Sequence, residues 1–524
     1  MTTAPPTEPT PPAPPDSPSV RPARKRVLGL IGAICLVHLW LATRSNEFHF
    51  QQHPDEISKI EQILENRRNL HHPLLMINAV DLAAKLRASV TPRRYDVKYW
   101  VQRRLTPQQV VEMGRMFSAL CTTLGIFLAA AAFVVTGRPW AGVGAAALMA
   151  PNYSIVLAAH FFKEDAALCL GLGAYLFTWS LFSAHPTRRR AILTGVATAL
   201  LLSGKWAGGI FILGHWIALL AWGDRKTAFR WLGWQLGVFC LVFAAINHQI
   251  FAALPTFREA ISGEVRVLTV GRDTPGTLLG KYNWWPLGWL NQEPGLSFLL
   301  ASGVALAAAF AGWFGRPWRT LAFVPIAYTL TLGLTDKFSA RYILPSGFLV
   351  LMFSGALLGR AAEGALAFPA KGWRLATLAV VGALAIAAIA VQAANTRHLP
   401  ADLRVSPHEA AWTWIRENLD GKPAKLMQIR RHLIPRETGL FDPATPPLPV
   451  ELSELNDRGL TYEALKKSGA THLIFRTMER NNRTRGVVDP GLFDDLDRLG
   501  KKVFEAPPGP VGIIQPGIEI YEIR

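Results

Sequence analysis

Long apolar stretches alternate with short charged segments through most of the first 400 residues. The apolar stretches lie near 27–42, 109–136, 139–159, 166–184, 190–204, 206–222, 229–253, 296–314, 319–335, 342–360 and 374–395. Most approach the length of about 20 residues that crosses a bilayer, so the pattern predicts a polytopic α-helical membrane protein with about eleven transmembrane helices. Half of the residues are hydrophobic and only 18% are charged, which agrees with this class.

Polar segments flank the apolar region at both ends. Residues 1–20 contain eight prolines, a composition that buries no core, so we expect a disordered tail over 1–26. The basic sequence RPARKR then precedes the first apolar run, which has no convincing cleavage site after it and predicts a retained signal anchor. Residues 397–524 predict a small α/β domain after the membrane domain of 27–396. Its expected strands are KLMQI, THLIF, KVFEA and IEIYEI, and its expected helices are SPHEAAWTWIRENL and YEALKKSG.

The distribution of charge predicts a topology. The net charge is +18, yet residues 397–524 hold 19 Lys/Arg and 18 Asp/Glu, so the excess flanks the apolar stretches and does not indicate nucleic-acid binding. With a cytoplasmic N-terminus, every short cytoplasmic loop is basic, as the positive-inside rule requires. These loops contain Arg138, Arg188 to Arg190, Arg225, Lys226, Arg230, Arg316, Arg319, Arg360, Lys371 and Arg374. An inner or plasma membrane protein with an extracytoplasmic C-terminal domain is therefore expected.

The first outer loop, roughly 45–106, is long for a membrane protein and carries the acid pair Asp55 and Glu56. The segment EISKIEQILEN after this pair places its apolar residues on one helical face. HHPLLMINAVDLAAKL follows and is too short and charged to cross a bilayer. We therefore expect two interfacial helices that hold the acid pair at the mouth of the membrane domain.

The unusual ionisable residues fall on the outer side of this topology. They are His53, Asp55, Glu56, His160, Lys163, Glu164, Asp165, Lys205, Arg258 and Arg341. A carboxylate at the membrane interface can act as a general base toward a hydroxyl. Lysine and arginine can bind a phosphate and stabilise it as a leaving group. The set suits an enzyme whose substrate is linked to a lipid phosphate.

Five ordered motifs resemble those of the glycosyltransferase-C superfamily, which includes protein O-mannosyltransferases, lipid A aminoarabinose transferases and dolichol-phosphate-mannose-dependent mannosyltransferases. The motifs are HPDE at 53–56, HHPLL at 71–75, GRMFSAL at 114–120, HFFKED at 160–165 and ARYILP at 340–345. The resemblance covers about residues 27–396. It implies transfer of a sugar, with inversion, from a polyprenyl-phosphate donor to a hydroxyl of a lipid, glycan or protein acceptor.

The resemblance also implies a role for each candidate residue. Asp55 would be the general base, and Glu56 would support it. His53, His160, Glu164 and Asp165 would shape the site or bind the acceptor. Lys163, Lys205, Arg258 and Arg341 would bind the lipid phosphate. Lys163 departs from the family motif, and a salt bridge between Lys163 and Glu164 is expected from their adjacency.

Other functions stay open at this point. A transporter or flippase of lipid-linked sugars would place ionisable residues near the bilayer midplane and would show an inverted repeat. A polymerase or ligase that uses lipid diphosphates would have an arginine-rich outer loop. The outer loop 254–295 contains several arginines, so this alternative stays open. Oligosaccharyltransferases of the superfamily need a divalent metal, but their WWD-like signature is missing, so we expect no cofactor. The four cysteines all lie in apolar stretches and indicate neither a disulfide framework nor a thiol nucleophile.

Overall fold

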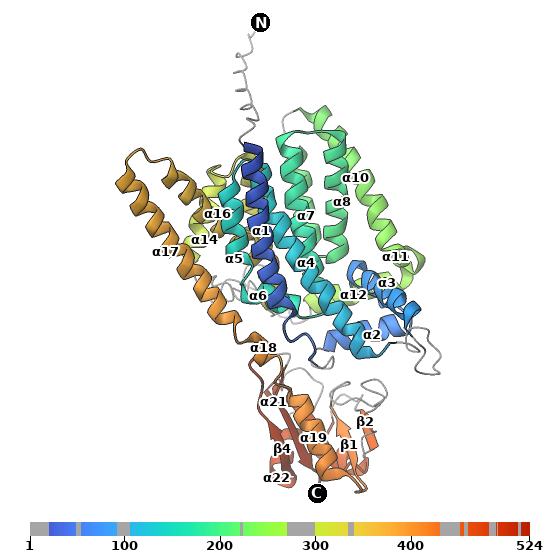
Figure 1. Ribbon diagram of the computed structural model, residues 1–524. Coiled ribbons are helices and arrows are strands. Elements are labelled where there is room, and N and C mark those ends of the chain that lie inside the picture. Colours follow the sequence, from blue (N-terminus) through green and yellow to red (C-terminus); the bar gives the residue numbers. More distant parts are fainter. Residues whose placement is uncertain are drawn as a thin grey trace, which may run out of the picture.

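The computed structural model describes residues 20–48, 54–91, 105–220, 224–269, 299–333, 340–429, 451–454, 460–481, 489, 491–511 and 515–524. A bundle of long helices forms the larger part of the molecule, and a small domain of strands and helices lies beyond one end of it (Figure 1). The first described helix begins at the other end of the bundle. The fold class predicted from the sequence, membrane helices followed by a small α/β domain, is confirmed.

The helical part follows the apolar pattern closely. It consists of α1 (Val20–Thr43), α2 (Pro54–Leu64), α3 (Leu75–Val90), α4 (Pro107–Val135), α5 (Pro139–Met149), α6 (Tyr153–Ala159), α7 (Glu164–Ala184), α8 (Arg188–Gly204), α9 (Gly208–Leu220), α10 (Arg225–Ile246), α11 (His248–Ala252), α12 (Leu254–Thr269), α14 (Leu299–Phe310), α15 (Arg316–Leu332), the 3-10 helix η2 (Ala340–Tyr342), α16 (Leu344–Leu366) and α17 (Lys371–Thr396). Within the described residues, six helices are long and apolar enough to cross a membrane. The pair α5 and α6, bent by 70°, makes a seventh if it counts as one broken span. The predicted number of about eleven stays a prediction.

The first helix begins earlier than expected. α1 starts at Val20, within the segment 1–26 that the sequence predicts to be a disordered tail. Its first turns contain arginine, lysine and alanine, which are good helix formers and extend the helix of the apolar run. The remaining residues of that tail lie outside the described part of the chain.

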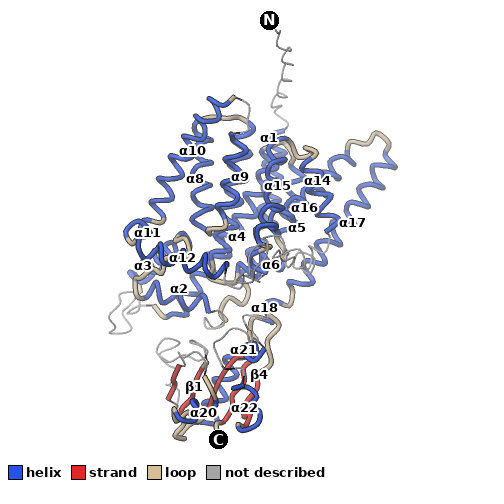
Figure 2. Tube along the Cα trace, turned by 180° about the vertical axis from the view of Figure 1, so that it is seen from behind, coloured by secondary structure: helices blue, strands red, loops and turns tan. Residues whose placement is uncertain are grey.

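Small residues let the central helices pack backbone to backbone. A Cβ added to Gly173 of α7 would lie 2.1 Å from the carbonyl oxygen of Gly125 in α4. Similarly, a Cβ added to Gly144 of α5 would lie 2.1 Å from the carbonyl oxygen of Gly355 in α16. Close approach at small residues is typical of membrane helices, where packing replaces the hydrophobic effect between helices. Figure 2 shows α8, α9 and α10 side by side, at one side of these central helices.

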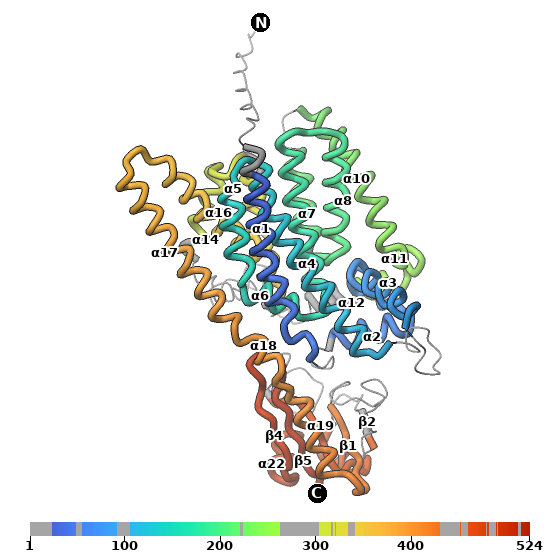
Figure 3. The backbone as a smooth tube through the Cα atoms, viewed as in Figure 1, coloured from blue at the N-terminus to red at the C-terminus, as the bar shows by residue number. Residues whose placement is uncertain are grey.

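Two short helices lie across the end of the bundle that faces the small domain (Figure 3). The apolar face of α2, formed by Ile57, Ile60 and Ile63, packs on side chains of α3 and α4. α3 instead exposes Leu82 and Leu86, which are 61% and 63% exposed and four residues apart. Helical spacing puts both on one face, as in a helix lying along a membrane surface. The predicted pair of helices in the first outer loop is thus present, with α2 the more enclosed.

The C-terminal domain contains a five-stranded mixed sheet. Its strands are β1 (Lys425–Gln428), β2 (Glu451–Glu454), β3 (His472–Arg476), β4 (Lys501–Ala506) and β5 (Ile518–Glu522), in the order β2-β1-β3-β5-β4. β1 pairs with β2 and β3 in parallel, while β5 pairs antiparallel with β3 and β4. Its helices are α18 (Leu399–Asp402), α19 (Pro407–Leu419), α20 (Tyr462–Lys467), α21 (Thr477–Asn481) and α22 (Gly491–Leu499). All predicted strands and helices are present, but β2 was not expected because ELSE has one apolar residue.

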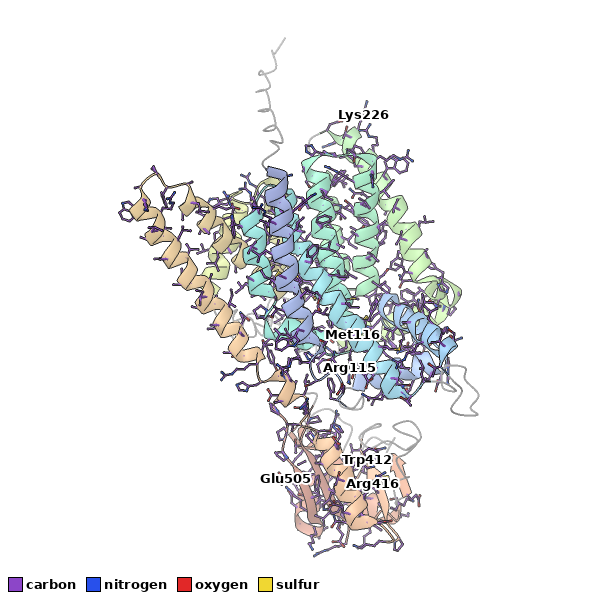
Figure 4. All side chains as sticks on the ribbon, in the orientation of Figure 1. Arg115, Met116, Lys226, Trp412, Arg416 and Glu505 are labelled. Atoms are coloured by element: carbon purple, nitrogen blue, oxygen red, sulfur yellow. The ribbon has the colours of Figure 1, made fainter. Side chains whose placement is uncertain are left out.

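The small domain packs against the end of the bundle. Leu399, Leu403 and Val511 form one buried cluster with Phe48 and Phe161 of the membrane part. Trp412 of α19 packs against the apolar cluster that holds α2, α3 and the start of α4. Figure 4 labels Trp412 and Arg416 along α19 and Arg115 near the end of α4 that faces this domain. The domain therefore contacts the same end of the bundle that carries the first outer loop.

Candidate active site

The acid pair begins α2, and its two side chains have different surroundings. Asp55 and Glu56 both lie in the first turn, where the positive end of the helix dipole favours carboxylates. The Asp55 side chain is 39% exposed, whereas the Glu56 side chain is fully buried. The two neighbouring carboxylates therefore have different surroundings: one reaches the surface, and the other is enclosed by protein.

Glu56 is fixed by Arg115 of α4, which is itself fully buried. Arg115 Nε donates to Glu56 Oε1 at 3.0 Å, and Nη2 donates to Oε2 at 2.6 Å. Arg115 Nη1 also donates to the carbonyl oxygens of Asn46, at 2.8 Å, and Phe48. The backbone N–H of Phe162 donates to Glu56 Oε1 at 2.7 Å. This group of contacts joins α2, α4, the segment after α1 and the segment before α7 around one bidentate ion pair.

Asp55 faces two cations from distant parts of the chain. Its Oδ2 atom lies 2.5 Å from Lys163 Nζ and 2.9 Å from Arg341 Nη1. The Lys163 side chain is only 7% exposed, and Arg341 is 40% exposed. Burial lowers the pKa of Lys163 to about 8, although Asp55 opposes the shift. The three charges meet at the end of the bundle that faces the C-terminal domain. The sequence predicts that all three lie on one side of the membrane.

The acids at the start of α7 are also paired, each with a different lysine. Glu164 forms an ion pair with Lys59 of α2 at 3.0 Å, and both side chains are almost fully buried. Asp165 pairs with Lys205, which follows α8. The expected salt bridge between Lys163 and Glu164 is wrong, because Lys163 pairs with Asp55. Lys163 is the extended N-cap of α7, with φ −140° and ψ 156°, so its side chain does not follow the direction of the helical residue beside it.

Tyr342 connects two of the predicted phosphate ligands. Lys205 Nζ lies 5.2 Å from the centre of the Tyr342 ring, and the Arg341 guanidinium carbon lies at the same distance. Cations at this distance are attracted to the negative face of an aromatic ring. Lys163, Lys205 and Arg341 therefore belong to one connected cationic group around Asp55, Asp165 and Tyr342.

Two predicted residues are described by the structure and are not part of this group. His160 is fully buried, and its two ring nitrogens lie 2.7 Å and 3.0 Å from the carbonyl oxygens of Val156 and Arg44. His160 joins the end of α6 to the end of α1. Because both ring nitrogens face backbone carbonyl groups, neither is directed toward an acceptor substrate. Arg258 is exposed on α12 and forms no ion pair with a described residue. His53 lies outside the described residues.

A polar cleft of about 260 Å³ opens beside Asp55. Its walls come from α2, the loop between α2 and α3, the first turns of α3 and Glu164 of α7. Asp55 lies on one wall, so a group in the cleft has access to a carboxylate that is itself held by Lys163 and Arg341. Among the described residues, no group of three or more His, Cys, Asp or Glu side chains is arranged to hold a metal ion.

Sequence reasoning missed Lys59 as a site residue and gave Arg115 no role of its own. Lys59 lies within the segment EISKIEQILEN, where a single lysine among isoleucines resembles a solvent-facing position. Arg115 lies eight residues into a 29-residue apolar helix, and that position was the available signal. A charged residue inside a membrane helix needs a partner, and the acids of the first outer loop were the nearest candidates.

Comparison with solved structures identifies the fold. ArnT from Cupriavidus metallidurans bound to undecaprenyl phosphate has a TM-score of 0.50 and 15% sequence identity, covering 94% of this chain and 97% of that one. The archaeal oligosaccharyltransferase AglB from Archaeoglobus fulgidus, in complex with an inhibitory peptide and a dolichol-phosphate, has a TM-score of 0.54 and 12% identity, covering 93% and 74%. Searches of protein-family models and of curated proteins gave no match. The chain therefore has the fold of the glycosyltransferase-C membrane enzymes, as its ordered motifs predict.

Proposed function

We propose that the protein is a membrane glycosyltransferase that moves a sugar from a polyprenyl-phosphate donor to an acceptor hydroxyl, with Asp55 as the general base. One observation carries the proposal: Asp55 is a partly exposed carboxylate on the wall of a polar cleft, and two cations contact it. This reaction requires a base for the hydroxyl and ligands for the departing phosphate. Here the base, Asp55, is in direct ion-pair contact with two such ligands, Lys163 and Arg341.

The balance of charge around Asp55 favours a donor with one negative charge. Within the described part of the chain, four cations, Lys59, Lys163, Lys205 and Arg341, surround the three acids Asp55, Glu164 and Asp165. The remaining pair, Glu56 with Arg115, is closed and neutral. The surplus of one positive charge matches a phosphodiester, the form in which a sugar is linked to a polyprenyl phosphate. A lipid diphosphate would bring at least one more charge than this group neutralises, which disfavours the polymerase or ligase alternative.

The same geometry gives Asp55 a different basicity before and after donor binding. A carboxylate contacted by two cations is a weak base, because both cations stabilise its charged form. When the donor phosphate accepts hydrogen bonds from Lys163 and Arg341, part of their charge is directed to the phosphate, and Asp55 becomes the stronger base. We therefore expect the donor to bind before the acceptor hydroxyl loses its proton.

The reaction follows from these positions. Asp55 accepts the proton of the acceptor hydroxyl, and the oxygen attacks the anomeric carbon of the donor sugar. The bond between that carbon and the phosphate oxygen breaks, with inversion, and the polyprenyl phosphate leaves with the bonding electrons. Lys163, Arg341 and Lys205 stabilise the charge that develops on the phosphate. Glu56 and Arg115 position α2 and do not touch the substrate.

The proposal includes metal-independent chemistry and a defined topology. Each of the four site acids already has a lysine or arginine partner, so cations of the chain occupy the positions that a metal would need. The neighbours solved with undecaprenyl phosphate and with a dolichol-phosphate support the class of donor. We place the N-terminus in the cytoplasm and the site and C-terminal domain outside an inner or plasma membrane, following the basic loops.

The test is transfer by the purified protein in lipid nanodiscs from a panel of radiolabelled polyprenyl-phosphate sugars, with membrane extracts as the source of acceptors. The proposal expects label to pass from at least one donor to an acceptor, with release of polyprenyl phosphate. Movement of a lipid-linked sugar across a vesicle membrane without any transfer would support the transporter alternative instead. Transfer from lipid diphosphates alone would overturn the choice of donor.

A further inference from the structure

The cleft beside Asp55 has one wall that does not belong to the ion-pair group. This wall is the loop from Glu65 to Leu74, between α2 and α3, and it faces α2 across the cleft. Its polar side chains in the cleft are Asn69, His71 and His72, and Ser58 and Gln62 of α2 lie on the other side. All five are uncharged or weakly basic groups that donate and accept hydrogen bonds.

Three remote contacts hold this loop in a fixed shape. Arg68 donates to Asp81 of α3 at 2.6 Å, and both side chains are buried. Trp206 Nε1 donates to the carbonyl oxygen of His71 at 3.0 Å. The N–H of Leu74 donates to Asn247 Oδ1 at 2.9 Å. The turns that follow α8 and α10 therefore support the cleft wall from behind, as in a pre-organised binding site.

The backbone of the loop is also constrained. Leu70 has a φ of 58°, which a leucine rarely adopts, and its side chain is only 1% exposed. Gln62 fixes the loop from the side of the cleft, because its Oε1 atom accepts the N–H of Asn69 at 3.0 Å. Such a conformation persists only where the surroundings enforce it, and sites for ligands are where it concentrates.

The lining of the cleft has the composition that a sugar ring requires. Hydroxyl, amide and imidazole groups line its sides, and the apolar side chains of Pro73, Leu74 and Ile77 complete it. A sugar presents hydroxyl groups at its edge and C–H groups on its face, so it uses both kinds of surface. The volume of about 260 Å³ lies below the roughly 300–1,000 Å³ of sites for drug-sized ligands. One ring fits this volume better than a chain of rings.

Once the donor phosphate has bound Lys163 and Arg341, the one described cation on the lining is Lys59, which is paired with Glu164, so the charges disfavour an anionic sugar. Asp55, Glu164 and Lys59 are its ionised carboxylate and ammonium groups, with two negative charges against one positive. The phosphate ligands Lys163 and Arg341 contact Asp55 from outside this lining. Resting on the proposed function, we propose that the cleft is a subsite for a single sugar ring without negative charge, and that the polar side chains of its lining, Ser58 and His72 among them, bind the ring.

The experiment compares His72→Ala and Ser58→Ala with His248→Ala, the control. His248 is exposed at the same end of the bundle and outside the cleft lining. The probes are polyprenyl phosphate and polyprenyl-phosphate-linked mannose, arabinose and glucuronate, added to protein in nanodiscs. Binding is measured for every probe, and KM is measured for donor and acceptor where transfer occurs. Loss of one hydrogen bond to a sugar hydroxyl predicts a change of roughly 3- to 10-fold.

If the ring belongs to the donor, His72→Ala and Ser58→Ala weaken binding of a neutral glycosyl lipid by that factor and leave bare polyprenyl phosphate unchanged. If the ring belongs to the acceptor, the KM of the acceptor rises by that factor and donor binding stays constant. Either result supports the subsite. If the ring belongs to the donor, the glucuronosyl lipid should bind no more tightly than bare polyprenyl phosphate.

The subsite is wrong if both variants match His248→Ala for every probe, or if they weaken bare polyprenyl phosphate as much as the glycosyl lipids. The proposed function would survive these results, because the wild-type protein would still bind polyprenyl phosphate and transfer sugar. If the wild-type protein does not bind polyprenyl phosphate at all, the proposed function fails, and the subsite fails with it.

Discussion

Replacing Arg115 with methionine tests whether the buried ion pair positions α2. Methionine has a similar length but donates none of the four hydrogen bonds that Arg115 makes to Glu56, Asn46 and Phe48. Glu56 stays in place as a buried carboxylate without its cation, which typically costs about 3–5 kcal/mol. The N–H of Phe162 donates to Glu56 at 2.7 Å, so its rate of hydrogen exchange shows how much stability this site loses. At a factor of ten per 1.4 kcal/mol, its hydrogen exchange should accelerate by about 150- to 4,000-fold.

The measurement is hydrogen–deuterium exchange with mass spectrometry on the protein in nanodiscs, resolved to peptides from α2 and from residues 160–165. Arg87→Met is the matched control, because Arg87 is exposed on α3. The double variant Glu56→Gln with Arg115→Met should recover part of the protection, since glutamine carries no charge and still accepts the Phe162 N–H. Equal exchange in Arg115→Met and Arg87→Met would refute the positioning role.

Three further predictions concern pH, metal and topology. The pKa of Lys163, which burial lowers to about 8, predicts that binding of polyprenyl phosphate weakens above pH 8, and that Lys163→Arg removes this limb; an unchanged limb in the variant would assign it to another group. The stability of the fold should change with pH in the opposite direction. Between pH 8 and about pH 10.4 the unfolded protein keeps the Lys163 proton and the folded protein loses it, so the free energy of unfolding rises with pH. A series of denaturation curves over this range would show the rise. Transfer should be unchanged after dialysis against EDTA, and a loss that Mn²⁺ or Mg²⁺ restores would contradict metal independence. In intact cells, a membrane-impermeant maleimide should label Glu505→Cys and not Lys226→Cys, because these residues lie at opposite ends of the molecule (Figure 4); the reverse pattern would invert the topology.

Much of the fold could be predicted because it depends on composition and period. Membrane helices are long and apolar, so the described helices lie within a few residues of the predicted stretches. The strands of the C-terminal domain were recognised by their short apolar runs, except β2, where ELSE offers no such run. The break between α5 and α6 was not predicted, since Pro151 and Asn152 lie within a continuous apolar stretch.

The proximity of several candidate residues could be predicted, but their pairing could not. The order of the motifs and the sidedness of the loops brought Asp55, Lys163, Lys205 and Arg341 to one end of the bundle. Which lysine meets which acid depends on the direction of each side chain at the start of α7, and adjacency in the sequence gave the wrong partner for Glu164. The sequence also does not show which of two neighbouring acids is buried. Asp55 and Glu56 look equivalent in the sequence, but of the two only Asp55 reaches the cleft.

The most direct test of the central claim is transfer by Asp55→Asn measured together with donor binding. Asparagine has nearly the same shape but cannot accept the proton of the acceptor hydroxyl at neutral pH. The account predicts that transfer falls by at least the roughly 100-fold typical of losing a general base, while the variant folds and binds polyprenyl phosphate as tightly as the wild type or more so, because Lys163 and Arg341 are released. Near-normal transfer by Asp55→Asn would contradict the assignment of Asp55 as the base.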